Sequence, residues 1–193
     1  MVLRALKALR GSRPRVAEPG SRGWNTLKTL VQIGVMWSVL LGVLPLAIGR
    51  VEAWLALPAL PGLERIGAGL FFACSMLGLW TANVMVRDGR GTPLPLDTAR
   101  DLVVSGPYRH VRNPMAIGGF GQGIGIGLWL GSPVVLGYVA VGAAIWQCLA
   151  RPWEERDLAE RFGARYERYR REVPCWAPRL TPYEDAGDGA RPR

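Results

Sequence analysis

Long uncharged stretches dominate this sequence and restrict what it can fold into. Residues 29–49, 66–86 and 115–150 contain no Asp, Glu, Lys or Arg, although the whole chain of 193 residues has a formal charge of +9. A helix rises about 1.5 Å per residue, so about 20 apolar residues cross a hydrocarbon core of about 30 Å. A soluble domain would spread its polar residues along the chain. The segregation therefore predicts an integral membrane protein.

The stretch 115–150 is too long for a single span, and Gly131, Ser132 and Pro133 interrupt it. It predicts a tight helical hairpin with spans at 115–130 and 134–150, both slightly short for a bilayer. With spans at 29–49 and 66–86, the fold class is an all-α, polytopic membrane helical bundle of about four transmembrane helices. The mostly apolar connection 50–65 is expected to lie along the membrane interface.

The positive charge predicts the orientation of the bundle. Of the 24 Lys and Arg residues, 22 fall in the segments 1–28, 87–114 and 151–193, which four spans place on one side. By the positive-inside rule that side is cytoplasmic, so both termini are cytoplasmic and the expected location is a bacterial inner membrane. Residues 1–28 are expected to form a flexible basic arm. A cleaved signal peptide is the alternative, but the run 29–49 is too long for one.

The segment after the last span predicts an amphipathic helix on the cytoplasmic side. Its apolar residues recur at spacings of four, four, three and four, which places them in one stripe along a helix. They are Leu158, Phe162, Tyr166, Tyr169 and Val173, and Pro174 follows them. The helix should lie on the membrane or pack against the cytoplasmic loops. Residues 29–180 would then form the membrane domain, and 181–193 a disordered tail.

The few cysteine and histidine residues exclude several classes of site. The three cysteines form no CxxC pair, which argues against a disulfide framework and against zinc. The only histidine, His110, removes most metal sites and the Ser-His-Asp arrangement. We expect the lipid bilayer as a partner and no nucleic acid, and the sequence leaves the oligomeric state open. Six glycines in span 115–130 indicate close helix packing, with a backbone contact to a cofactor as the alternative.

Two polar segments flank the predicted hairpin. One, 102–114, leads into span 115–130, and the other, 151–158, leads out of span 134–150. Because the spans form a hairpin, these segments must be neighbours, and Tyr108, Arg112 and Asn113 should approach Glu154 and Glu155. A purely structural interpretation has the arginines bind lipid phosphates while Glu154 pairs with one of them.

The motifs in these segments resemble a family of membrane methyltransferases. Residues 106–115 read Gly-Pro-Tyr-Arg-x-x-Arg-Asn-Pro-Met, and residues 154–174 read Glu-Glu-x-x-Leu-x-x-x-Phe-Gly-x-x-Tyr-x-x-Tyr-x-x-x-Val-Pro. This pattern, with an apolar hairpin between the motifs, resembles isoprenylcysteine carboxyl methyltransferases and the related phospholipid methyltransferases, over about residues 88–179. The resemblance implies a membrane-embedded enzyme that uses S-adenosyl-L-methionine to methylate a small lipophilic or lipidated acceptor.

The resemblance also implies roles for individual residues. Arg112 and Glu155 would be catalytic, and Arg109 and Arg151 would bind substrate. The cofactor-binding residues would be Arg100, Asp101, Leu102, Val103, Tyr108, Asn113, Pro114, Met115, Ala116 and Glu154. A carboxylate such as that of Glu154 can accept hydrogen bonds from the ribose hydroxyls or the ammonium group of the cofactor.

The sequence departs from the carboxyl methyltransferase pattern at several positions. Asn113 and Ala116 stand where His and Tyr are usual, Arg100 where His is common, and Cys175 where Arg is common. Three alternatives therefore stay open: an N-methyltransferase acting on a phospholipid or lipid amine, a membrane reductase of related architecture with a nicotinamide cofactor, and a non-enzymatic membrane scaffold. For an amine acceptor, Glu155 or His110 could serve as the base.

Overall fold

The structure, a computed structural model, describes residues 22–89 and 100–185, and every regular element in these two ranges is a helix. The predicted basic arm lies outside the described residues up to position 21. The last seven residues of the predicted arm, 22–28, are described, and they form the beginning of a helix that starts at Arg22.

The first helix is long and contains one π-helical turn. Helix α2 (Arg22–Trp37), the π-helical turn η1 (Ser38–Val43) and helix α3 (Leu44–Trp54) follow one another without a break. Pro45, in the first turn of α3, has no N–H to donate, and the π-helical turn directly precedes it. The predicted span at 29–49 lies within an apolar helix that runs from Thr26 to Trp54 and is long enough to cross a membrane.

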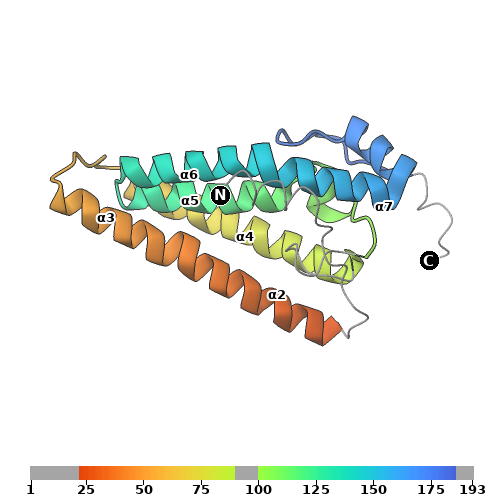
Figure 1. Ribbon diagram of the computed structural model, residues 1–193, viewed down its shortest axis with the longest axis horizontal. Coiled ribbons are helices and arrows are strands. Elements are labelled where there is room, and N and C mark those ends of the chain that lie inside the picture. Colours follow the sequence, from red (N-terminus) through yellow and green to blue (C-terminus); the bar gives the residue numbers. More distant parts are fainter. Residues whose placement is uncertain (1–21, 90–99, 186–193) are drawn as a thin grey trace, which may run out of the picture.

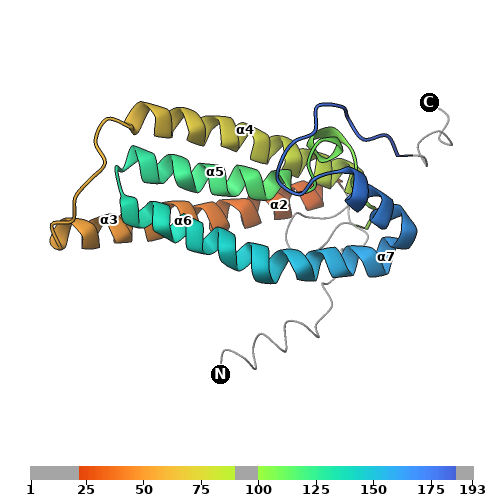
Figure 2. The ribbon, with the colours of Figure 1, turned by 90° about the horizontal axis from the view of Figure 1, so that it is seen from above.

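Three further helices lie side by side, and the middle one, α5 (Pro114–Trp129), runs antiparallel to the other two (Figures 1 and 2). The other two are α4 (Glu64–Gly89) and α6 (Pro133–Ile145), so the predicted hairpin at 131–133 is present. Gly131 turns the chain with a φ of 61°, and a Cβ there would lie 2.9 Å from the Leu60 carbonyl oxygen. Only glycine fits both the conformation and this close contact.

Glycines also explain how closely α5 approaches α4. A Cβ on Gly67 would lie 2.4 Å from the backbone nitrogen of Trp129, and a Cβ on Gly125 would lie 2.8 Å from the Gly67 carbonyl oxygen. Such distances are shorter than van der Waals contact, so the two backbones touch where side chains would normally separate them. For Gly67 and Gly125 the structure supports close helix packing.

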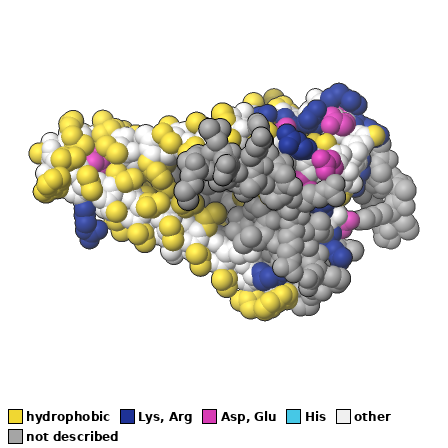
Figure 3. Space-filling view, in the orientation of Figure 1, with side chains coloured by type: hydrophobic (Ala, Val, Ile, Leu, Met, Phe, Trp, Pro, Cys, Tyr) yellow, Lys and Arg dark blue, Asp and Glu magenta, His cyan; other side chains and the backbone are white. Residues whose placement is uncertain are grey.

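Hydropathy and charge divide the molecule into two ends. Among the described residues, three helices are long and apolar enough to cross a membrane: Thr26–Trp54, Glu64–Gly89 and Pro133–Glu172. Helix α5, with 16 residues, runs between α4 and α6 over the same depth (Figure 2). Figure 3 shows hydrophobic side chains over much of the elongated body and most charged side chains at the end that contains α7. The protein is an integral membrane helical bundle, and the count of four spans remains a prediction.

The charged end is built by the last helix and the loop before α5. Helix α7 (Arg151–Glu172) continues from α6 through the π-helical turn η3 (Trp146–Ala150), and it bends at Gly163, whose φ is 51°. Its predicted apolar stripe packs against the loop: Tyr166, Tyr169 and Val173 form a buried cluster with Leu102 and Tyr183. This is the second of the two arrangements that the sequence allowed.

Tyr183 extends the folded part of the chain beyond its expected limit. It lies in the segment expected to be a disordered tail, yet its side chain is 2% exposed. Its backbone N–H donates a hydrogen bond to the Arg109 carbonyl oxygen at 2.8 Å. The ordered structure therefore reaches at least Asp185, and residues 186–193 lie outside the described part.

Candidate functional site

A cavity of about 680 Å³ lies where the charged end meets the apolar spans. Side chains from α2, α5, α6 and α7 and from the loop before α5 form its wall. The polar residues at its charged end are Tyr108, Arg112, Asn113, Glu154, Asp157 and Arg161. The aromatic residues that line it include Trp37, Phe120, Tyr138, Trp146 and Trp153. The cavity is therefore polar at one end and apolar over most of its length.

Glu154 contributes an isolated carboxylate to this cavity. Burial, together with the nearby negative charge of Glu155, raises its pKa from 4.5 to about 7. No hydrogen bond or ion pair joins this carboxylate to another of the described residues. A buried carboxylate without a partner carries a desolvation cost that a bound cation or hydrogen-bond donor would offset. Glu154 is thus prepared to bind a positively charged or hydroxyl-rich group.

Asp157 and Arg161 follow Glu154 on the same face of α7. They lie three and seven positions further along, the spacing of neighbouring residues on one side of a helix. The two side chains form an ion pair with 3.0 Å between Arg161 Nη1 and Asp157 Oδ2. The sequence prediction missed both, although their spacing from Glu154 would have indicated them.

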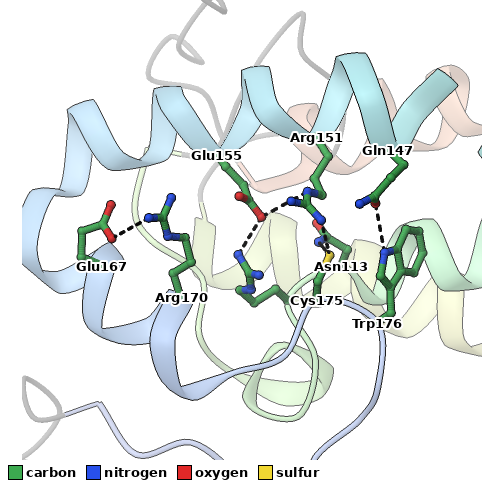
Figure 4. A network of polar contacts seen from close by, with 9 residues as sticks. Asn113, Gln147, Arg151, Glu155, Glu167, Arg170, Cys175 and Trp176 are labelled. Atoms are coloured by element: carbon green, nitrogen blue, oxygen red, sulfur yellow. Dashed lines mark hydrogen bonds and ion pairs between the residues drawn. The ribbon is translucent and has the colours of Figure 1, made fainter. Parts of the chain in front are cut away.

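An ion pair connects the two flanks of the hairpin. Arg112 Nη1, from the loop, lies 2.6 Å from Glu155 Oε1 of α7, and both side chains are largely buried. Arg151 Nε lies 3.5 Å from the same carboxylate oxygen (Figure 4). The prediction that these flanks are neighbours in space is confirmed. Arg112 also lines the cavity, and its Nε is buried without a hydrogen-bond partner among the described residues.

Tyr108 is held firmly in the wall of the cavity. The 3₁₀ turn η2 (Gly106–Arg109) positions it, and the hydroxyl of Tyr169 donates a hydrogen bond to its carbonyl oxygen at 2.8 Å. Burial and the nearby Glu154 charge raise the pKa of the Tyr108 hydroxyl, so this group stays neutral and can donate a hydrogen bond. Asn113, just before α5, lines the same cavity and donates from Nδ2 to Cys175 Sγ at 3.1 Å.

The structure divides the predicted cofactor-binding residues into two groups. Those that line the cavity are Tyr108, Asn113, Met115, Ala116 and Glu154. The others lie elsewhere: Arg100 and Asp101 are exposed, Leu102 and Val103 are buried in two different hydrophobic clusters, and Pro114 is buried in the first turn of α5. The roles assigned to all ten residues remain predictions.

The predicted catalytic and substrate-binding residues also separate. Arg112 lines the cavity, whereas Glu155, Arg109 and Arg151 do not. Arg109 Nε donates to the Tyr183 carbonyl oxygen at 2.8 Å, and Arg151 contacts Glu155 and Cys175. His110, considered as a base, has its Nδ1 2.9 Å from the Arg179 carbonyl oxygen. Arg109, Arg151 and His110 thus contact groups of the loops and of the C-terminal segment.

The apolar end of the cavity includes residues that were not predicted as part of a site. Met36, Trp37, Leu40 and Leu41 come from the first helix, which lies outside the region of resemblance, 88–179. The hydroxyl of Tyr138 donates to the Leu40 carbonyl oxygen at 3.3 Å, which ties α6 to the first helix. Phe120 and Trp146 contact each other edge to face, with ring centroids 6.1 Å apart. An alkyl or aryl group fits such a wall.

The fold and the cavity define a class: a membrane-embedded helical protein with an internal site that is charged toward one membrane surface and apolar within the bundle. The sequence model of the family described as phospholipid methyltransferase matches residues 63–165, slightly more than half of the chain. The protein belongs to this family. The matched region contains α4, α5, α6 and the part of α7 that carries Glu154 and Arg161.

One curated relative is similar to a large part of this chain. Methanethiol S-methyltransferase 2 of Bradyrhizobium diazoefficiens is 29% identical over 152 residues, which cover 74% of this chain and 53% of the relative. The chain thus spans about half the length of the curated relative that it matches.

Proposed function

We propose that this protein transfers a methyl group from S-adenosyl-L-methionine to a small lipophilic acceptor that enters from the membrane. One observation carries the proposal: a single cavity joins the isolated Glu154 carboxylate to an apolar wall inside the bundle. Membership of the phospholipid methyltransferase family supports the reaction class. A charged methyl donor and an apolar acceptor require the combination of surfaces that this cavity has.

The residues present fit the methyl donor. Glu154 would bind its ammonium group or its ribose hydroxyls, since the carboxylate has no other partner among the described residues. Arg112, with its buried and unsatisfied Nε, would bind the carboxylate of the donor. Tyr108 and Asn113 provide further hydrogen-bonding groups at this end, and Met115 and Ala116 provide apolar contacts.

The other residues act by position and by excluding water. When bound, S-adenosyl-L-methionine supplies an electrophilic methyl carbon: a lone pair of the acceptor forms the new bond, the carbon–sulfur bond breaks with its electrons going to sulfur, and an acceptor that carries a proton releases it to water. Trp37, Phe120 and Trp146 would align the acceptor and keep the apolar end dry, which favours such a displacement. Glu155, whose carboxylate is shared by Arg112 and Arg151, would act by holding Arg112 in place.

The methyl group could be transferred to an oxygen, nitrogen or sulfur atom of the acceptor. The motifs resemble those of carboxyl O-methyltransferases, the family is named for phospholipids, and the relative in Bradyrhizobium diazoefficiens is named for a thiol. Incubation with radiolabelled methyl donor and a total lipid extract, followed by base treatment, separates these cases. Label released as methanol identifies an ester, whereas retained label identifies methylation on nitrogen or sulfur.

Ligand binding tests the reaction class itself. Purified protein in detergent is expected to bind S-adenosylhomocysteine, the demethylated product of the donor. A membrane reductase would bind a nicotinamide cofactor instead, and a scaffold would bind neither. Failure to bind S-adenosylhomocysteine, together with the absence of methyl transfer, would overturn the proposal.

A further inference from the structure

Gln122 is the most deeply buried polar side chain in the wall of the cavity. It lies on α5, it is 1% exposed, and it is one of the residues that line the cavity. Its position is nine residues beyond Asn113, about 13 Å further into the bundle along α5. Gly123, next in the chain, and Val139, on α6, also line the cavity at this level. An amide is therefore present in a part of the cavity that is otherwise mostly apolar.

A chain of hydrogen bonds fixes which end of this amide faces outward. The Ser75 hydroxyl donates to the Phe71 carbonyl oxygen at 2.7 Å, which uses its only hydrogen. Ser75 Oγ can therefore only accept, and Gln122 Nε2 donates to it at 2.9 Å. The amide nitrogen is thus directed toward α4, and no hydrogen bond to the carbonyl oxygen comes from any of the described residues. The oxygen is left as a fixed acceptor beside the cavity.

We propose that the Gln122 carbonyl oxygen accepts a hydrogen bond from the methyl acceptor and thereby selects acceptors that carry a proton on the reacting atom: a thiol, a hydroxyl or an amine. This inference rests on the methyl transfer proposed above and specifies the substrate class for the same cavity. An amide oxygen is not basic enough to remove the proton. Gln122 is therefore a positioning residue that directs the lone pair of the acceptor toward the methyl carbon.

The same oxygen disfavours a carboxylate. An ionised carboxylate has only acceptor oxygens, and beside another acceptor oxygen in an apolar wall it would lose hydration without gaining a hydrogen bond. At neutral pH a thiol keeps its proton and a fatty acid has lost its own. Gln122 thus favours a neutral acceptor, whereas the resemblance to carboxyl methyltransferases predicted a carboxylate.

Competition between two acceptors of equal chain length tests this inference. Decanethiol and decanoate are offered together to the purified protein with radiolabelled S-adenosyl-L-methionine, and the thioether and ester products are separated. Gln122→Met keeps the size of the side chain and removes the amide oxygen, while Ser75→Ala removes the group that holds the amide. Gln147→Met is the matched control, since Gln147 lies outside the cavity and its amide accepts from Trp176 Nε1. A product ratio does not depend on how much of a variant is folded.

We expect the native protein and Gln147→Met to favour the thiol. Gln122→Met should lower the thioether-to-ester ratio about tenfold, the effect of one hydrogen bond, with Ser75→Ala in the same direction. Binding of S-adenosylhomocysteine should be the same in all four proteins, because Glu154 and Arg112 are unchanged. A native preference for decanoate, or a ratio unaffected by Gln122→Met, would overturn this inference and leave the methyltransferase proposal intact. Absence of S-adenosylhomocysteine binding and of both products would overturn both.

Discussion

At the scale of single residues, the proposed binding of the methyl donor depends on one carboxylate. Glu154 lines a largely apolar cavity, and burial and the Glu155 charge raise its pKa to about 7. Its neighbour Glu155 is instead satisfied by two arginines. The two adjacent glutamates therefore differ: Glu155 joins the loop to α7, and Glu154 is the residue that we propose to bind the ligand.

Replacing Glu154 by glutamine should separate binding from stability. We expect Glu154→Gln to weaken S-adenosylhomocysteine binding by tenfold or more, on the order of 1.5–3 kcal/mol for a hydrogen bond to a charged group. Thermal stability in detergent should be kept or rise, since a buried charge without a partner is removed. Titration calorimetry and thermal unfolding measure the two quantities. Glu172→Gln, an exposed position at the end of α7, is the control. Equal binding by both variants would remove Glu154 from the site.

The raised pKa of Glu154 predicts how binding and stability depend on pH. Because the pKa in the folded protein is about 7 and the ordinary value is 4.5, the folded state holds this proton more tightly than the unfolded state. The resulting contribution to stability is present below pH 4.5 and is lost as the pH rises through about 7. Binding of an ammonium group needs the charged form, so affinity for S-adenosylhomocysteine should rise with pH and level off above about 7.

Measuring the affinity for S-adenosylhomocysteine between about pH 6 and about pH 8 tests whether Glu154 is the titrating group. At the acid end the affinity should rise by nearly tenfold per pH unit. Glu154→Gln should flatten the profile. A slope that persists in this variant would assign the titration to another group.

Single residues also show where sequence reasoning about the site ends. The resemblance and the predicted hairpin together identified six of the residues that line the cavity, Arg112 among them. They could not tell that Leu102 and Val103 are buried in separate hydrophobic clusters, because the direction of a side chain in an irregular loop depends on its packing partners. Nor could they reveal the Ser75–Gln122 hydrogen bond, which joins residues 47 positions apart.

At the scale of helices, the contact between α4 and α5 depends on the absence of side chains. We expect Gly67→Ala to lower the free energy of unfolding by about 1–3 kcal/mol, because its Cβ would meet the backbone of α5 at Trp129 and force the helices apart. Gly69→Ala is the matched control on the same helix, since a Cβ there has no neighbour within 4 Å. Thermal or denaturant unfolding in detergent compares them. Equal stability of the two variants would show that α4 and α5 can separate without cost.

The prediction of helices from the sequence was accurate within the hairpin, but it treated α6 and α7 as separate helices. The hairpin spans predicted at 115–130 and 134–150 correspond closely to α5 and to α6 with η3. The continuity of α6 with α7 through η3 was not predicted, because the span was ended where charge begins, at Arg151. In the structure a π-helical turn precedes Pro152, as another precedes Pro45. Such a turn shifts the hydrogen-bond pattern where proline donates none, and the helix continues.

At the scale of the whole molecule, the site requires that the charged segments share one side of the membrane. The structure brings them together: the loop before α5 and helix α7 are joined by the Arg112–Glu155 ion pair, while the turn at Ser132 lies at the opposite end of the hairpin. Most Lys and Arg residues lie in these segments, so the positive-inside rule predicts that this end is cytoplasmic.

This orientation can be measured with single cysteines in a background in which Cys74, Cys148 and Cys175 are replaced. Arg100→Cys and Glu167→Cys lie at the charged end, and Pro58→Cys lies in the exposed connection between α3 and α4. We expect a membrane-impermeant thiol reagent to label the first two only in inside-out vesicles and Pro58→Cys only in right-side-out vesicles. If Arg100→Cys and Glu167→Cys react from opposite sides, the two flanks of the hairpin cannot enclose one cavity, and the proposed site is lost. If both react together from outside, the site stands and its orientation is reversed.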